Sequence, residues 1–169
     1  MRPIIAVCCS DGDDPDLSTH AIEVAEEVGR CIAKNNCILV CGGRTGIMEA
    51  VCRGVKEEKG LTVGILPESR GEANRFVDIP IVTGIGHRRN FLVVNAADAV
   101  IAISGRWGTL SEISFAIIFD KPVILIRGTG GVVDKITSDS FKEFLPSKCF
   151  IVDSAREAVE KALEEVRRG

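Results

Sequence analysis

The amino-acid sequence predicts an open, doubly wound, Rossmann-like α/β sheet of about six or seven mainly parallel strands with helices on both faces. Short, continuous apolar runs rich in β-branched residues recur along the chain, and segments with helical apolar spacing lie between them. Continuous apolar runs are typical of strands covered on both faces. Strands and helices that alternate in this way are joined by right-handed crossovers, which place the strands parallel in one sheet.

The expected strands are the apolar runs at 4–9, 37–41, 61–66, 79–82, 99–103, 123–126 and 149–152. Helical spacing is clearest for Ala21, Val24, Ala25, Val28 and Ile32, and again for Met48, Val51, Cys52 and Val55. A last helix is expected from Ser154, because Ser154 and Glu157 match the capping-box pattern.

Length and composition predict a single globular domain over residues 1–169. Apolar residues make up 46% of the chain and charged residues 27%, which is enough apolar surface for a buried core. The formal net charge of -3 gives no overall attraction to nucleic acids or anionic membranes. We therefore expect a small-molecule ligand and neither a nucleic-acid nor a membrane partner.

The seven cysteines are expected to be reduced, buried thiols in a cytoplasmic protein. The start of the chain has no secretory signal pattern, and no apolar run reaches the length of a membrane span. Cys37 and Cys41, placed on one strand, would lie about 13 Å apart, too far to share one ion. We therefore expect no metal site.

Two glycine-rich loops carry the functional signal. Gly42-Gly43-Arg44-Thr45-Gly46 follows the strand that ends at Cys41, and Ser104-Gly105-Arg106-Trp107-Gly108-Thr109 follows the strand that ends at Ile103. A helix is expected after each loop, so backbone amides can face a phosphate at the carboxyl edge of the sheet. One such loop could be turn chemistry only, whereas two at matching positions favour a phosphorylated ligand. Neither loop has the Walker or the dinucleotide-binding spacing, which argues against a dehydrogenase.

Three segments together resemble the LONELY GUY (LOG) superfamily, long mislabelled as lysine decarboxylases. Residues 42–48 look like its first glycine loop, His87-Arg88-Arg89-Asn90 looks like its Met-His-Glu-Arg-Lys segment, and residues 105–112 look like its Pro-Gly-Gly-x-Gly-Thr-x-x-Glu signature. The resemblance runs from about Ile4 to Ile126. It is closest to the short-chain branch that includes molybdenum cofactor carrier proteins.

The resemblance implies a site and a reaction. Family enzymes hydrolyse the N-glycosidic bond of nucleoside 5′-monophosphates, and the motif positions of their catalytic glutamate and arginine fall on Glu112 and Arg89. The remaining motif positions imply ligand or phosphate binding by Gly42, Gly43, Arg44, Thr45, Gly46, Met48, Arg88, Asn90, Gly105, Arg106, Trp107, Gly108 and Thr109. No cofactor is required; the bound molecule would be a nucleotide, phosphate or a molybdopterin-type ligand.

The sequence also departs from the family pattern at three positions. Ser104 replaces the signature proline, Arg106 its second glycine, and Asn90 the lysine of the basic segment. These changes fall in the phosphate loop and the basic cluster. Three functions therefore stay open: a nucleotide N-glycosidase, a non-catalytic carrier of a pterin such as molybdenum cofactor, and a nucleotide-sensing module.

Several site residues also have a purely structural interpretation. Glu112 could close a capping box with Thr109 rather than act on a ligand. Arg88 and Arg89 at a helix start oppose the helix dipole, which a bound anion would relieve, but both could be solvated. Trp107 could stack on a base or cover the loop, and His87 could be a turn residue.

The expected helix that starts at Thr109 has almost no polar face. Ile113, Phe115, Ala116, Ile117, Ile118 and Phe119 leave apolar side chains on every side. Either a neighbouring segment of the same chain or a partner subunit must cover them. We expect a homodimer, or a larger homo-oligomer, with residues 115–119 near the interface.

Overall fold

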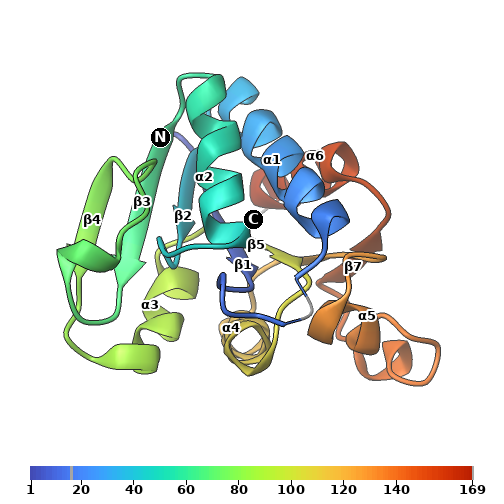
Figure 1. Ribbon diagram of the computed structural model, residues 1–169. Helices are drawn as coiled ribbons and strands as arrows, with labels where there is room; N and C mark the ends of the chain where they lie inside the picture. Colours follow the sequence, from blue (N-terminus) through green and yellow to red (C-terminus); the bar gives the residue numbers. More distant parts are fainter. Residues whose placement is uncertain (16, 169) are drawn as a thin grey trace.

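The computed structural model, which describes residues 1–15 and 17–168, contains one sheet of seven parallel strands (Figure 1). The strands are β1 (Ile4–Cys9), β2 (Ile38–Cys41), β3 (Leu61–Leu66), β4 (Ile79–Val82), β5 (Ala99–Ile103), β6 (Val123–Ile126) and β7 (Cys149–Val152). Their order is β4-β3-β2-β1-β5-β6-β7, and every neighbouring pair is parallel. The predicted fold class is confirmed. Only β2 begins one residue later than expected, because the Cys37 amide donates to the Ile32 carbonyl and belongs to the preceding turn.

The helices that connect the strands are α1 (Thr19–Lys34), α2 (Ile47–Glu57), α3 (Asn90–Asn95), α4 (Trp107–Ile118), α5 (Gly131–Ile136) and α6 (Ala155–Arg168). Short 3-10 turns occur at Arg70–Glu72, Gly86–Arg89 and Lys142–Phe144. The expected cap at the start of α6 is present, since the Ser154 hydroxyl accepts a hydrogen bond from the Glu157 amide at 3.3 Å. No helix in the described ranges is long and apolar enough to cross a membrane.

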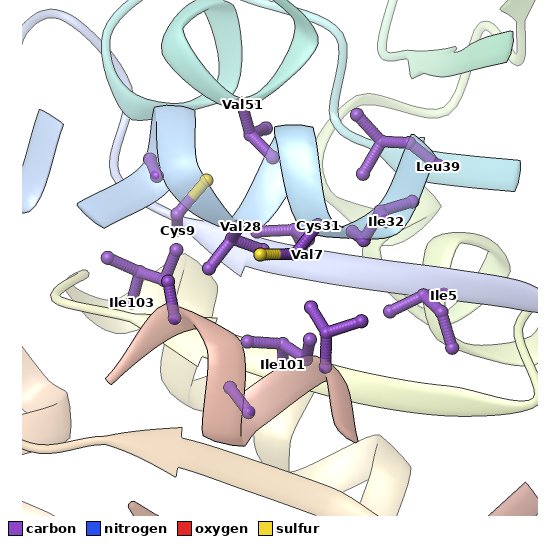
Figure 2. Packing of buried hydrophobic residues seen from close by; sticks show 14 of the residues in the cluster. Ile5, Val7, Cys9, Val28, Cys31, Ile32, Leu39, Val51, Ile101 and Ile103 are labelled. Atoms are coloured by element: carbon purple, nitrogen blue, oxygen red, sulfur yellow. The ribbon is translucent and has the colours of Figure 1, made fainter. Parts of the chain in front are cut away.

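Both faces of the central sheet are buried, each by its own set of helices, whereas edge strand β4 is largely exposed and is not covered on both faces as its apolar run predicted. On β1, Val7 and Cys9 face a core shared with α1, α2 and α6, which Figure 2 shows from close by. Ala6 and Cys8 alternate with them and face the second core, under α3, α4 and α5. Successive side chains of a strand point to opposite faces, so two cores explain the continuous apolar runs of the sequence.

Helices α1 and α2 pack backbone against backbone through two glycines. A Cβ atom at Gly54 would lie 2.0 Å from the carbonyl oxygen of Glu26, and one at Gly29 would lie 2.2 Å from that of Val51. Any larger residue would separate the two helices. This contact fixes α2, whose N-terminus follows the first glycine loop.

The chain changes direction between β1 and β5. The strands from β1 to β4 extend the sheet on one side, whereas β5 to β7 extend it on the other. The connections after β1 and β5 therefore diverge at the carboxyl edge, which leaves the crevice where doubly wound sheets bind ligands.

Candidate functional site

A cavity of about 440 Å³ lies at this crevice, at the carboxyl ends of β1, β2 and β5. Both predicted glycine loops contribute to its wall. It is lined by Val7, Cys9, Ser10, Asp11, Asp13, Asp14, Gly42, Arg44, Met48, His87, Arg89, Asn90, Arg106, Trp107, Gly108, Thr109 and Glu112. The lining thus combines cationic, anionic and aromatic side chains with the starts of α2 and α4.

The first loop supplies Gly42, Arg44 and Met48 to the lining. Gly43, Thr45 and Gly46 do not line the cavity and instead shape the loop. Gly46 has φ +68, and a Cβ atom there would lie 2.5 Å from the amide nitrogen of Gly12. Only glycine fits this conformation and this close approach.

The second loop supplies Arg106, Trp107, Gly108 and Thr109. Gly105 lies outside the lining and has φ +92; a Cβ atom there would lie 2.2 Å from the hydroxyl oxygen of Thr109. Trp107 stands at the edge of the cavity with 79% of its surface exposed, so its ring does not cover the loop. It is free to contact a ligand.

Helix α4 begins at Trp107, two residues before the predicted start. Glu112 is therefore in the second turn, too far along the helix for a capping box with Thr109, and that interpretation is wrong. The carboxyl group is buried in the cavity wall. Burial raises the pKa of Glu112 to about 7, although the positive charge of Arg89 and a hydrogen bond with the Cys8 thiol favour ionisation.

Arg89 is a buried arginine with unused hydrogen-bonding capacity. It ends the 3-10 turn before α3 and is only 6% exposed. Its Nε and Nη1 atoms are buried and have no hydrogen-bond partner among residues 1–15 and 17–168. Arg89 and Glu112 face the same cavity, and they are not within ion-pair distance of each other in the described part of the chain.

The other members of the basic segment behave differently. Arg88 is exposed and lies outside the cavity lining, whereas His87 lines the cavity. Asn90 also lines it and donates from Nδ2 to the Gly108 carbonyl at 3.3 Å and to the Ser111 hydroxyl at 2.8 Å. The asparagine that replaces the family lysine therefore ties this segment to the start of α4.

Sequence reasoning missed the loop after β1, which contributes Ser10, Asp11, Asp13 and Asp14 to the lining. The Asp11 carboxylate accepts a hydrogen bond from the Thr45 hydroxyl at 2.6 Å and forms an ion pair with Arg44 at 2.7 Å. These contacts hold the β1 loop against the first glycine loop. The position of this loop could have indicated its role, because a polar loop that follows a central strand lies at the same edge of the sheet as the two glycine loops.

The second loop is supported from behind by the connection between β6 and α5. The Ser104 amide donates to the Thr129 hydroxyl at 2.8 Å, and the Val132 amide donates to the Gly105 carbonyl at 2.7 Å. Ser104 is almost fully buried and has φ +52, a left-handed conformation that is uncommon for residues other than glycine. This support was not predicted from the sequence.

The cysteines are free thiols, six of them buried and Cys149 half-buried. Cys41 and Cys52 are neighbours, with their sulfur atoms 3.6 Å apart. Across the described ranges, no three histidine, cysteine, aspartate or glutamate side chains are grouped so that they could hold a metal ion.

Part of the apolar surface of α4 is exposed. Ile113 and Ala116 are buried in the core, whereas Ile118 is 71% exposed and Phe119 is 38% exposed. The rings of Phe91, Phe115 and Phe119 stand in a row, with centroids 6.2 Å and 5.9 Å apart. The chain itself covers one side of this helix and leaves an aromatic row, Phe91–Phe115–Phe119, beside exposed Ile118.

Comparison with known proteins supports the family resemblance. A family model described as the SLOG cluster4 family matches residues 2–159. An uncharacterised protein of Archaeoglobus fulgidus is 41% identical over 112 residues, which cover 66% of this chain and 74% of that protein. A cytokinin riboside 5′-monophosphate phosphoribohydrolase of Rhodococcoides fascians is 30% identical over 135 residues, covering 73% of this chain and 67% of the enzyme.

Solved structures extend this likeness to the full length. The molybdenum cofactor carrier protein of Chlamydomonas reinhardtii is 30% identical, with a TM-score of 0.84 and coverage of 99% of both chains. The chain belongs to the SLOG cluster4 family, within the LOG superfamily that includes molybdenum cofactor carrier proteins.

Proposed function

We propose that the chain binds a phosphorylated nucleotide or nucleotide-like small molecule in the cavity between its two glycine loops. The observation that carries this proposal is Arg89, whose buried guanidinium has two nitrogen atoms without partners in the described part of the chain. Burying a charge with unsatisfied donors is costly. A phosphate oxygen in the cavity would satisfy these donors with charge-assisted hydrogen bonds.

Two helix starts support the same placement of the phosphate. Met48 lies in the first turn of α2, and Gly108 and Thr109 lie in the first turn of α4; all three line the cavity. Amides of a first turn have no acceptor within their own helix and carry partial positive charge. They suit an anion. Exposed Trp107 offers a flat face at the cavity edge on which a heterocycle can stack.

We further propose that the bound nucleoside 5′-monophosphate is hydrolysed at its N-glycosidic bond. The bond between the ribose C1′ and the base nitrogen breaks, water supplies the oxygen at C1′ and a proton to the base, and the products are free base and ribose 5-phosphate. A carboxyl group that titrates near neutral pH can hold or release that proton, which suits Glu112. Arg89 would bind the anionic substrate beside it. Similarity to the Rhodococcoides fascians enzyme supports this reaction.

The second candidate is a non-catalytic carrier of a phosphorylated pterin such as molybdenum cofactor. It is favoured by similarity to the Chlamydomonas reinhardtii carrier protein over 99% of both chains. Arg106, which replaces a family glycine in the cavity lining, would add a cation suited to binding without turnover. A nucleotide sensor would use the same cavity and differ only in a ligand-dependent change of assembly.

The proposed assembly is a homodimer, or a larger homo-oligomer, that buries the aromatic row beside Ile118. A second copy is the proposed partner because a two-fold axis would bring the exposed side chains of Ile118 and Phe119 against the same apolar residues of the other copy. We place the protein in the cytoplasm, where its seven cysteines would stay reduced. Nucleic acid and membranes are not proposed partners.

The decisive experiment incubates the pure protein with a panel of nucleoside 5′-monophosphates and measures free base by chromatography. Binding is followed in parallel through the fluorescence of Trp107, which is the single tryptophan of the chain. For the hydrolase, Glu112→Gln should still bind and should lose turnover by at least about a hundredfold. If no base is released although phosphorylated ligands bind, the hydrolase proposal fails and the carrier or sensor remains. If no phosphorylated ligand binds, the binding proposal fails.

A further inference from the structure

The thiol groups of Cys41 and Cys52 are in contact beside the first glycine loop. Cys41 is the last residue of β2 and precedes Gly42, whereas Cys52 lies in the middle of α2. Their sulfur atoms are 3.6 Å apart, and the Gly43 amide donates a hydrogen bond to the Cys41 sulfur at 3.3 Å. The proposed binding function uses neither thiol.

The two thiols are electrostatically unequal. A hydrogen bond from Cys52 lowers the pKa of Cys41 despite the opposing effect of burial, and the Gly43 amide and the charge of Arg89 act in the same direction as Cys52. The same bond to Cys41, together with burial, raises the pKa of Cys52. Of the two, Cys41 is therefore the thiol that ionises more readily, and Cys52 is the hydrogen-bond donor.

We propose that Cys41 and Cys52 form a reversible disulfide that switches the ligand cavity off under oxidising conditions. With a peroxide as oxidant, the Cys41 thiolate attacks one peroxide oxygen, which gives a sulfenic acid and one water once a proton is supplied. The Cys52 sulfur then attacks the Cys41 sulfur, the S–S bond forms, and a second water leaves. In total, two thiols and one hydrogen peroxide give one disulfide and two waters. A thiol reductant reverses the reaction by disulfide exchange.

Closing this bond must move the glycine loop. A disulfide needs a sulfur separation of about 2.05 Å, so the two sulfur atoms must approach by roughly 1.5 Å. The loop is closely packed, because a Cβ atom at Gly43 would lie 2.8 Å from the Gly64 Cα and the Arg89 guanidinium lies against Gly42. We therefore expect the shift to reach Arg89 and the cavity wall.

The connection to the cavity also provides the route for the oxidant. Cys41 and Cys52 are both 0% exposed, but Gly42, adjacent to Cys41, lines the cavity, and so does Cys9. We therefore place the entry of a small peroxide at the cavity, where an opening of the first glycine loop would admit it to Cys41. An anion bound in the cavity would slow the oxidation.

The test treats the reduced protein with hydrogen peroxide and maps the product by mass spectrometry after trypsin digestion in denaturant. Trypsin cuts after Lys34, Arg44 and Arg53, so the disulfide would join peptides 35–44 and 45–53. Adenosine 5′-monophosphate is the probe for binding, followed through Trp107 fluorescence. We expect the linked peptides to appear, the affinity for this probe to fall at least tenfold, and dithiothreitol to restore both.

Matched variants separate this switch from general oxidative damage. Cys37→Ala removes the other thiol of peptide 35–44 and should respond to peroxide like the unchanged protein. Cys52→Ala should form no linked peptide and keep its affinity through the treatment; Cys41→Ala serves the same purpose if Cys52→Ala does not fold.

One readout does not depend on the proposed ligand, because the rate at which trypsin cuts the native protein after Arg44 reports the loop directly. We expect oxidation to change this rate at least fivefold. If reduced protein does not bind the probe, the proposed function loses support, and the switch is judged by this rate alone. The switch is overturned if no linked peptide forms, or if it forms without changing either the affinity or the cleavage rate.

Discussion

The guanidinium group of Arg89 lies against the backbone of Gly42, so that a Cβ atom at position 42 would be 2.4 Å from Nη1 and 2.5 Å from Nη2. The absence of a side chain at position 42 thus makes room for the guanidinium of an arginine 47 positions later in the sequence. The first glycine loop and the basic segment are therefore in direct contact, and a substitution at Gly42 should displace the Arg89 side chain.

Substituting the two glycines of this loop should therefore have different effects. Gly42→Ala pushes only on the flexible ends of Arg89 and Met48, so the protein should fold, and its affinity for adenosine 5′-monophosphate should fall about tenfold. Gly43→Ala places a side chain at φ +70 and 2.8 Å from the Gly64 Cα atom, and should lower the free energy of unfolding by more than about 1 kcal/mol. Chemical denaturation and fluorescence titration measure the two effects. Equal losses of stability in the two variants would contradict this distinction.

Removing the charge of Arg89 should weaken binding without weakening the fold. Arg89→Met removes the buried nitrogen atoms that lack partners in the described ranges and keeps an unbranched apolar chain in place of the inner part of the side chain. The free energy of unfolding should stay unchanged or rise by about 1–3 kcal/mol, while phosphate and nucleotide affinity should fall at least tenfold. Arg88→Met is the matched control, because Arg88 is exposed and outside the cavity lining. A comparable loss of affinity in this control would place the anion elsewhere.

Stability should depend on pH through Glu112. The folded-state pKa of about 7 lies above the ordinary value of 4.5, so folding favours the protonated form. This contribution is fully present below pH 4.5 and is lost as the pH rises through 7, by about 3 kcal/mol in total. Glu112→Gln should remove this slope and be more stable than the unchanged protein at pH 8.

Unfolding in denaturant at pH 5 and at pH 8 measures this difference. The control is Glu160→Gln, which removes an exposed carboxylate from α6 and should keep the slope of the unchanged protein. The same slope in Glu112→Gln would mean that Glu112 is ionised at neutral pH.

The aromatic row beside Ile118 should control the oligomeric state. Ile118→Glu places a charge on a residue that is 71% exposed, so the isolated fold should tolerate it, whereas burial in a dimer should not. Light scattering should show a dimer for the unchanged protein and a monomer for Ile118→Glu at micromolar concentration. Phe144→Glu is the control, because Phe144 is 79% exposed and lies outside the α4 surface. A monomeric unchanged protein would rule out this interface.

The sheet could be predicted from the sequence because its central strands are buried on both faces, whereas the edge strand β4 is apolar but largely exposed, with Ile79 and Ile81 each 44% exposed. In a strand such as β5, both Ile101 and Val100 need apolar surroundings, so the whole run is apolar and its ends are clear. The end of a strand is misplaced where a turn residue continues the apolar run. Cys37 extends such a run, yet its amide is used by the end of α1.

The site was less accessible to sequence reasoning. Glycine loops after strands could be found, but which of two neighbouring arginines faces inward depends on the phase of a short 3-10 turn, which favours Arg89 over Arg88. The β1 loop was missed because Ser10 and Asp11 are ordinary turn residues, and their role follows only from the central position of β1. The identity of the ligand and the assembly stay predictions.

Ser104 has a consequence for the history of this family. Its left-handed backbone and its amide hydrogen bond to Thr129 are both impossible for proline, the residue of the family signature at this position. Ser104→Pro would therefore break this loop unless other residues changed with it. We expect residues 104 and 129 to vary together among relatives, with a hydroxyl group kept at 129 wherever 104 donates an amide hydrogen bond.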